Sequence, residues 1–222
     1  GRNLVIGVTG SKGKSTTATL IYEIIKESGR EAEFLGNIGK PMLERLLKPI
    51  KKDVIFVLEL SSAQLDDINF SPDISVVTSL FPEHMDYHRT IKNYYEAKNN
   101  IISFQNKDNY FVCNLKNKII KNWLKDYKGK AEPFSKSNLK TYLLLGEHNK
   151  YNIGAAIAVA RILGVKDGII RESIKNFKGL SHRLEFVGEF KGIKFYDDAI
   201  STTPESTIEA IKSLKNIGTI LL

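Results

Sequence analysis

The residues with the clearest chemical meaning form a glycine loop near the start of the chain. The loop reads Gly10-Ser11-Lys12-Gly13-Lys14-Ser15-Thr16. It follows an apolar run and precedes a segment whose apolar residues recur at helical spacing. This order is typical of nucleotide phosphate sites, because glycine-loop N–H groups and a helix N-terminus attract anions. Lys14 would reach the terminal phosphates and Ser15 would hold Mg²⁺, although Val8 stands where the strict motif has its first glycine.

Two further segments place polar side chains after predicted strands. Glu59 ends the apolar strand predicted at 53–60, and the segment 82–88 follows the strand predicted at 73–78. Ligands of open parallel sheets bind beyond the carboxyl ends of the strands, so we expect both segments to meet the glycine loop. Glu59 could hold magnesium against the phosphates. The alternative is a hydrogen-bonded carboxylate at a strand end.

His84 and His88 are four residues apart, a spacing that suits two zinc ligands on one helix face. No third ligand with suitable spacing supports zinc here.

Lys98 lies on the apolar face of the helix predicted at 90–105, four residues from both Tyr94 and Ile102. It could extend its ammonium to the surface. Alternatively, burial could lower its pKa and leave a neutral amine that forms a carbamate with carbon dioxide, which is an anionic metal ligand. Tyr94, Tyr95 and Phe104 are predicted core positions of the same helix.

The elements that must position these residues alternate along the chain. Predicted strands are 3–8, 53–60, 73–78, 109–113 and 141–145. Predicted helices are 14–28, 40–48, 90–105, 115–125, 148–163 and 167–176. The pattern indicates an α/β fold with a mostly parallel sheet covered by helices on both faces.

The pattern changes after Gly179. Strands are predicted at 184–189 and 193–196, a helix at 205–214 with Pro204 in its first turn, and a strand at 218–222. We expect one domain over 1–178 and the incomplete start of a second, Rossmann-like α/β domain over 179–222. The first residue is Gly1 rather than Met, so we also expect that residues precede it.

The composition limits the class of protein. The 222 residues are 42% hydrophobic and 26% charged, as in soluble globular proteins. No apolar run approaches the roughly 18 residues of a membrane span. Cys113 is the only cysteine, which excludes an internal disulfide and a thiolate zinc cluster and favours a reducing cytoplasm. The net charge of +8 is scattered and suits anionic small substrates as well as nucleic acid.

Taken in order, these motifs resemble the Mur ligases, the ATP-dependent ligases that build the peptide stem of bacterial peptidoglycan. The resemblance rests on the glycine loop, on Glu59-Leu60-Ser61-Ser62, and on Glu83-His84-Met85-Asp86 followed by Ala97-Lys98. Further matches are Gly36-Asn37-Ile38-Gly39, the segments 148–152 and 181–185, and Asp197-Asp198 before Thr202. Within the family, Glu-Leu-Ser-Ser is most similar to the members that add D-glutamate.

The resemblance implies a role for each matched residue. The loop residues from Gly10 to Thr16 bind ATP, and Lys14, His84 and Lys98 are catalytic. One magnesium ion is held by Ser15 and Glu59, and a second by His84 and carbamylated Lys98. The adenine and ribose of ATP are contacted by Asn149, Arg183 and Asp198. The UDP-N-acetylmuramoyl-L-alanine side includes Asn37 and Ser61, and Thr202 borders the D-glutamate site.

The activity implied is amide bond formation between UDP-N-acetylmuramoyl-L-alanine and D-glutamate through an acyl phosphate, by a cytoplasmic monomer that binds neither nucleic acid nor membrane. Two residues depart from the family pattern: Lys12 replaces an asparagine, and Ile200 replaces a lysine in many D-glutamate ligases. Another Mur-type or folylpolyglutamate-type ligase is therefore an alternative. A phosphate-loop ATPase acting on nucleic acid and a non-catalytic nucleotide binder are alternatives from other classes.

Overall fold

A computed structural model describes the chain except for residues 1–2, 38–41, 140, 142–143, 203 and 215–222. In chain order the elements are β1 (Val5–Thr9), α1 (Lys14–Glu27), β2 (Ala32–Gly36), α2 (Met42–Leu46), β3 (Ile55–Glu59), α3 (Ser62–Asp66), β4 (Ile74–Val77), α4 (Met85–His88), α5 (Ile91–Ser103), β5 (Tyr110–Cys113), α6 (Lys118–Trp123), β6 (Lys130–Pro133), α7 (Glu147–Ile162), α8 (Asp167–Asn176), β7 (Glu185–Phe190), β8 (Ile193–Asp197) and α9 (Pro204–Ser213).

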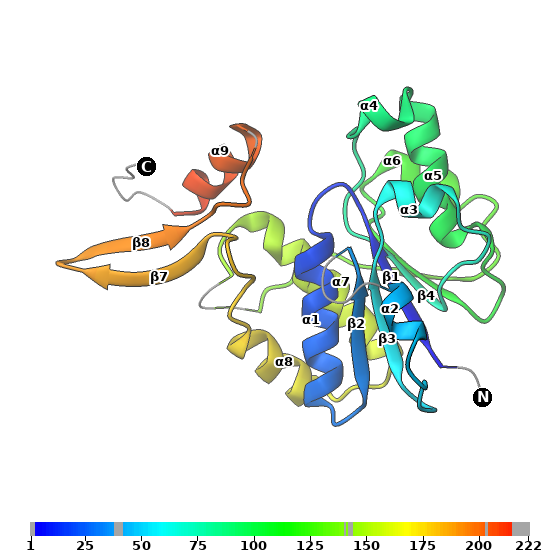
Figure 1. The fold of residues 1–222 in the computed structure, drawn as a ribbon, viewed down its shortest axis with the longest axis horizontal. Helices are drawn as coiled ribbons and strands as arrows, with labels where there is room; N and C mark the ends of the chain where they lie inside the picture. The colour runs from blue at the N-terminus through cyan, green and yellow to red at the C-terminus, as the bar shows by residue number, and fades with distance from the viewer. Residues whose placement is uncertain (1–2, 38–41, 140, 142–143, 203, 215–222) are drawn as a thin grey trace.

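Six of these strands form one parallel sheet in the order β2-β3-β1-β4-β5-β6. In the central strand, Gly7 pairs with Leu58 of β3 and with Ser75 of β4. Because β1 lies between β3 and β4, the segments that follow these three strands open at the same edge of the sheet. The α/β fold with a parallel sheet is confirmed (Figure 1).

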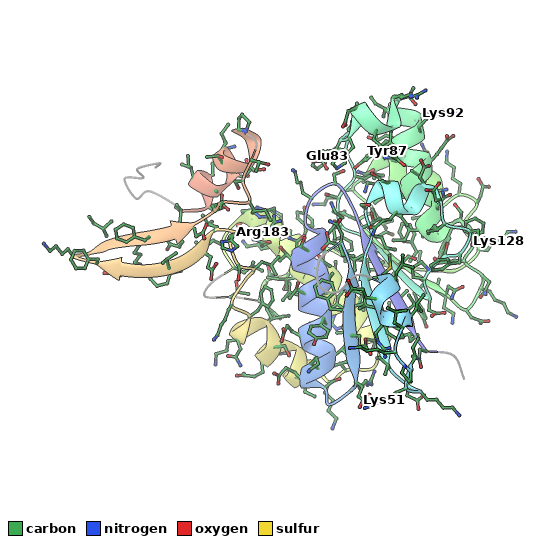
Figure 2. The ribbon with its side chains drawn as sticks, viewed as in Figure 1. Lys51, Glu83, Tyr87, Lys92, Lys128 and Arg183 are labelled. Carbon is green, nitrogen blue, oxygen red and sulfur yellow. The ribbon has the colours of Figure 1, made fainter. Side chains whose placement is uncertain are left out.

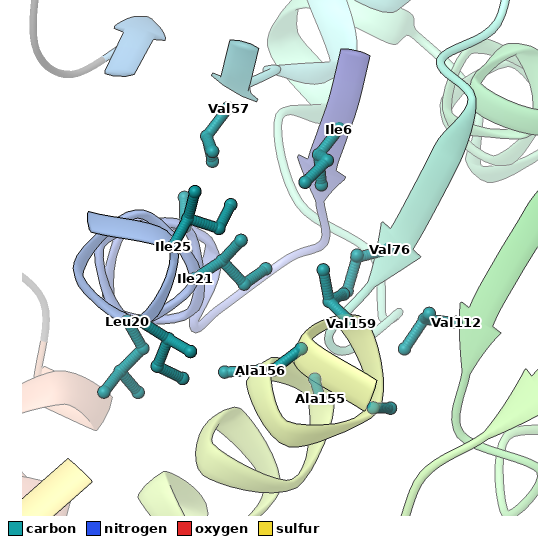
Figure 3. Close-up of a cluster of buried hydrophobic side chains, with 14 of the residues drawn as sticks. Ile6, Leu20, Ile21, Ile25, Val57, Val76, Val112, Ala155, Ala156 and Val159 are labelled. Atoms are coloured by element: carbon teal, nitrogen blue, oxygen red, sulfur yellow. The ribbon is translucent and has the colours of Figure 1, made fainter. Parts of the chain in front are cut away.

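One face of the sheet is covered by α1, α7 and α8. Ile21 of α1 and Val159 of α7 pack with Ile6, Val57 and Val76 of the strands in a common buried cluster (Figure 3). Two neighbouring alanines of α7 are fully buried in the same cluster. Small side chains there let α7 approach α1 closely, and the two helices are packed together.

The opposite face is covered by α3, α5 and α6. Phe56 and Leu58 of β3 point into this second cluster, whereas Val57 between them points into the first. Successive side chains of a strand face opposite sides of the sheet, so one continuous apolar run serves both cores. Tyr94 of α5 and Phe111 of β5 are fully buried in the second cluster.

The sequence did not predict β2, α3, α4 or β6. All four residues of β6 are exposed, because it is an edge strand, and its sequence has no apolar alternation. The strand predicted at 141–145 is wrong for its described residues: Thr141, Leu144 and Leu145 belong to no strand, and 142–143 lie outside the described residues. Phe104 was also a wrong core prediction, since it caps the end of α5 and is 51% exposed.

The segment after α8 stands apart from the sheet. Strands β7 and β8 form an antiparallel hairpin that extends away from the sheet and is followed by α9 (Figure 1). The predicted elements 184–189, 193–196 and 205–214 are thus confirmed within one or two residues, while the predicted strand 218–222 lies outside the described residues. Among the described helices, none has the length and apolar character needed to cross a membrane.

Candidate functional site

The glycine loop joins β1 to α1 and packs tightly on both sides. Gly13 is the N-cap of α1 with φ 87°, and Gly10 has φ 151°. A Cβ atom would lie 2.1 Å from Thr78 Oγ1 at Gly10 and 2.2 Å from Asn152 Oδ1 at Gly13. Only glycine fits these two positions, because both the backbone conformation and the close neighbours exclude a side chain.

The segment after β4 holds the first part of the loop. The N–H of Ser11 donates to Ser79 O (2.9 Å) and that of Lys12 donates to Ser79 Oγ (2.8 Å). Thr78 Oγ1 donates to Lys12 O (2.7 Å). These contacts occupy the first loop N–H groups. The first-turn N–H groups of α1, which lack intrahelical acceptors, are therefore the donors suited to an anion.

Lys14 is folded back across the loop. Its Nζ donates to Gly10 O (3.1 Å) and Ser11 O (3.0 Å). Burial lowers the pKa of Lys14, and the nearby carboxylates of Glu59 and Glu83 oppose that effect. The lysine predicted to bind terminal phosphates therefore lies in an enclosed site that contains both signs of charge.

Glu59 ends β3 and is 1% exposed. Its Oε1 accepts a hydrogen bond from Asn37 Nδ2 (3.4 Å), while Oε2 is buried without a partner among the described residues. A buried carboxylate oxygen without a donor is costly and fits a cation. Ser15 lies in the first turn of α1 and is 8% exposed. A hydroxyl and a carboxylate are oxygen ligands of the kind that Mg²⁺ prefers, so this donor set fits the ion.

Ser61, predicted to contact substrate, caps α3. Its Oγ accepts from the N–H of Gln64 (3.2 Å), and the Gln64 side chain accepts from the Ser61 N–H (2.9 Å). The pair forms a complete capping box. Asn37 joins the same edge, because its N–H donates to Glu59 O (3.0 Å).

Lys98 of α5 is 2% exposed, as its place on the apolar face predicted. Its Nζ donates to Gly10 O (3.0 Å) and to Thr9 Oγ1 (3.2 Å) and lies 5.1 Å from the centre of the Tyr94 ring. Burial, assisted by the neighbouring Lys14 charge, lowers the pKa of Lys98 to about 7. Lys98 therefore has a substantial neutral fraction at neutral pH.

Tyr94 links the same helix to the loop, a contact that the sequence did not reveal. Ser11 Oγ donates to Phe81 O (2.6 Å), so the Tyr94 hydroxyl donates to Ser11 Oγ (2.9 Å). Tyr94 is fully buried, and burial raises its pKa to about 12, so the hydroxyl keeps its proton. The four-residue spacing of Tyr94 and Lys98 was the available signal that one helix face meets the loop.

His84 is exposed and begins α4 in a left-handed conformation (φ 56°). Burial lowers the pKa of His88, and the charges of His84 and Lys98 lower it further. His88 itself is 4% exposed and packs its ring against Tyr94. Within the described ranges, no cluster of three potential metal-binding side chains contains His84 or His88, so the zinc alternative gains no support.

The remaining predicted residues approach from α7 and the hairpin. Asn149 is buried and accepts from Asn152 Nδ2 (2.8 Å), and Asn152 contacts the loop at Gly13. Arg183 lies near the N-terminal end of α1 (Figure 2), close enough to contribute to the lowered pKa of Lys14. Its Nε is buried without a hydrogen-bond partner among the described residues.

Asp198 and Thr202 lie farther along the same segment. Asp198 Oδ1 accepts from the N–H of Leu184 (2.8 Å) and closes the base of the hairpin. Thr202 is exposed, and its N–H donates to Ile200 O (3.0 Å). Among the described residues, Thr202 makes no hydrogen bond to the loop.

Comparison with known proteins agrees with this geometry. A family profile described as the Mur ligase middle domain matches residues 8–143. A UDP-N-acetylmuramoylalanine–D-glutamate ligase of Thermoanaerobacter sp. (strain X514) is 34% identical over 95% of this chain and 52% of its own length. The ligase of the same name from Streptococcus mutans serotype c is 36% identical over 98% of this chain and 53% of its own length.

The fold is also similar to a solved structure. The MurF ligase of Thermotoga maritima, solved in complex with ADP, superposes with a TM-score of 0.77 and 22% identity, over 96% of this chain and 57% of that one. The chain thus spans about half the length of the curated relatives it matches.

Proposed function

The chain belongs to the Mur ligase family, and on that premise we propose that the whole protein uses ATP to join D-glutamate to UDP-N-acetylmuramoyl-L-alanine. The observation that carries the proposal is the convergence of Lys14, Glu59 and Lys98 around one phosphate loop. The names of the similar ligases support the choice of substrates.

The proposed reaction has two steps. The alanine carboxylate attacks the γ-phosphorus of ATP, the bond to the β-phosphate oxygen breaks, and an acyl phosphate and ADP result. The D-glutamate amine then attacks the acyl carbon, the bond to the phosphate oxygen breaks, and phosphate leaves while the amine loses a proton. Lys14 and the α1 N-terminus stabilise charge on the transferred phosphoryl group, so catalysis is electrostatic and positional.

Ser15 and Glu59 are the residues we propose for one magnesium ion, which when bound neutralises phosphate charge. The unpartnered Glu59 Oε2 supports this assignment. His84 and a carbamate on Lys98 are proposed for a second ion. In carbamate formation the neutral amine of Lys98 attacks carbon dioxide and releases a proton. The lowered pKa supports this step, and the carbamate nitrogen keeps one N–H for Gly10 or Thr9.

On the family resemblance we propose Asn149, Arg183 and Asp198 for the adenine and ribose of ATP, and the buried, unpartnered Nε of Arg183 is a donor open to a ligand. For the acceptor side we propose Asn37 and Ser61. Thr202 is proposed for D-glutamate on the family resemblance alone.

The nucleic-acid alternative needs aromatic side chains that can stack with bases. Tyr94 is fully buried and hydrogen-bonded to Ser11, so it cannot serve as such a platform, whereas Phe104 at the end of the same helix is 51% exposed and leaves the decision to the assay below. The scattered basic charge adds no support for that alternative.

The test is an ADP-release assay on the full-length protein with UDP-N-acetylmuramoyl-L-alanine and a panel of amino acids. We expect ADP release only with D-glutamate. ADP release with another amino acid would support a ligase of different amino-acid specificity. Ile200, which stands where many D-glutamate ligases have lysine, leaves that outcome open. Release stimulated by polynucleotides and unaffected by the UDP substrate would contradict the proposal.

A further inference from the structure

Lys12 presents a second cation at the mouth of the phosphate loop. Its backbone is held at both polar atoms, because its N–H donates to Ser79 and its carbonyl accepts from Thr78 and Ser79. Its side chain is nevertheless 57% exposed. The backbone of Lys12 is therefore fixed, while its exposed side chain can change its partner.

The present partner is Glu83. Lys12 Nζ lies 3.2 Å from Glu83 Oε1, and the Glu83 side chain is 20% exposed. Glu83 lies close to the loop (Figure 2), and its charge also acts on Lys14 and Lys98 by opposing the fall in their pKa values. The charge of Lys14 also acts on Glu83, so this carboxylate does not depend on Lys12 alone for compensation.

We propose that Lys12 is a second phosphate-binding residue that exchanges its ion pair with Glu83 for a contact with the γ-phosphate of ATP. The inference rests on the proposed function, since it requires ATP in this loop. Lys12 then determines the preference for ATP over ADP, because only ATP carries the phosphate that competes with Glu83.

The exchange is favourable on electrostatic grounds. Ion pairs that are open to solvent contribute little to stability, so leaving Glu83 costs little. A terminal phosphate carries more charge than a carboxylate and offers several acceptor oxygens, and charge-assisted hydrogen bonds are the stronger ones. Lys14 continues to compensate Glu83 after Lys12 has moved. Once the γ-phosphate has been transferred, Lys12 returns to Glu83 and ADP is held less tightly.

The experiment measures the Kd values of AMP-PNP and ADP with Mg²⁺ by calorimetry at low salt, for the 222-residue chain and its variants. We expect Lys12→Asn to weaken AMP-PNP binding about tenfold or more and ADP binding less than about threefold, the range for one lost charged hydrogen bond. Lys12→Arg should restore AMP-PNP binding. Glu83→Gln should tighten AMP-PNP binding, because it frees Lys12 and removes a negative charge.

The matched control is Lys92→Asn, which removes the same charge from an exposed pair with Glu96 on α5 and should change neither Kd. Thermal melts of every variant establish that each is folded. If Lys12→Asn and Glu83→Gln each weaken the binding of AMP-PNP and of ADP to the same extent, the ion pair only stabilises the arrangement of the two loops. The inference would then be wrong. An unchanged Kd in Lys12→Asn would also overturn it.

The same measurements separate this inference from the proposed function. Binding of AMP-PNP that is lost in Lys14→Ala supports the phosphate loop whatever Lys12 does. If the unchanged protein binds neither nucleotide, the proposed nucleotide site fails, and the inference about Lys12 fails with it.

Discussion

The carbonyl oxygen of Gly10 accepts hydrogen bonds from two lysines at once, from Lys14 at 3.1 Å and from Lys98 at 3.0 Å. Two ammonium groups that converge on one acceptor in a buried site repel each other, and water cannot screen them there. Releasing one proton relieves this repulsion. Lys98 is the lysine whose pKa falls to about 7, since burial is the largest cause and the Lys14 charge is the next.

The first prediction concerns the pH dependence of stability. The pKa of Lys98 is about 7 in the folded chain against 10.5 for an ordinary lysine, so above pH 7 the unfolded chain binds more protons. The free energy of unfolding should therefore rise with pH, by at most about 1.4 kcal/mol per pH unit for one proton. Lys98→Met should reduce this slope, as measured by urea denaturation between pH 7 and 8.5.

The measurement stops at pH 8.5 because, above this pH, ionisation of Cys113 lowers the free energy of unfolding. Burial raises the pKa of this thiol to about 12 from 9.0, so the unfolded chain loses that proton first and stability falls. A slope that is the same in Lys98→Met and in the unchanged protein would contradict the assignment to Lys98.

The second prediction is that Lys98 forms a carbamate. The protein incubated with ¹³C-bicarbonate and Mg²⁺ should show a carbamate signal by NMR that grows from pH 6 to pH 8, because the amine loses its proton over that range. Lys98→Met should lack the signal. In the ligase assay, Lys98→Ala should lose most activity, and short-chain carboxylic acids should restore part of it. If the unchanged protein shows no carbamate signal and Lys98→Ala keeps full activity, the carbamate is ruled out, and Lys98 only donates hydrogen bonds to the loop.

At the scale of the elements, the sequence predicted what depends on local periodicity. Local patterns were sufficient to predict that three strand ends meet around the loop. These patterns are the apolar runs of β1, β3 and β4 and the helical spacing of α1 and α5. The edge strand β6 has no such pattern, because its side chains face solvent.

The parts of the site that the sequence could not predict depend on contacts between distant segments. Tyr94 reaches Ser11 across 83 positions, and Ser79 reaches Lys12 across 67. A single hydrogen bond at that separation leaves no periodic trace in the sequence. The ion pair of Lys12 with Glu83 is of the same kind.

The third prediction compares two helical glycines. In α7, a Cβ at Gly154 would lie 1.9 Å from the carbonyl oxygen of Ser135, whereas in α8 nothing lies within 4 Å of a Cβ at Gly168. Gly154→Ala should destabilise the protein by about 1–3 kcal/mol, because the backbone must move. Gly168→Ala should stabilise it by about 0.4–1 kcal/mol, because alanine reduces the conformational freedom of the unfolded chain and meets no neighbour in the folded one. Chemical denaturation measures both, and equal effects would mean that α7 does not pack this closely.

At the scale of the whole molecule, the two apolar cores end before the hairpin begins. Both buried clusters consist of sheet-domain residues, and Leu180 is the last described residue packed against them. Across the junction, charges act on two pKa values that burial lowers: the Arg183 charge lowers that of Lys14 further, and the Glu209 charge opposes the fall for His148. We propose a domain boundary after residue 178, with the second segment supplying charge to a site that the first one builds.

The fourth prediction separates these two contributions with a chain that ends at Leu180. It retains both cores, so its melting temperature should stay within a few degrees of that of the 222-residue chain. Its affinity for Mg²⁺–ATP should be weaker, because Arg183 and Asp198 are missing, and Arg183→Ala in the 222-residue chain should reproduce part of the loss. Thermal unfolding and calorimetry measure the two effects on the same samples. An unfolded 1–180 chain would show that the hairpin and α9 are part of the sheet domain and that the boundary is wrong. A folded 1–180 chain with full affinity would instead remove both Arg183 and Asp198 from the nucleotide site.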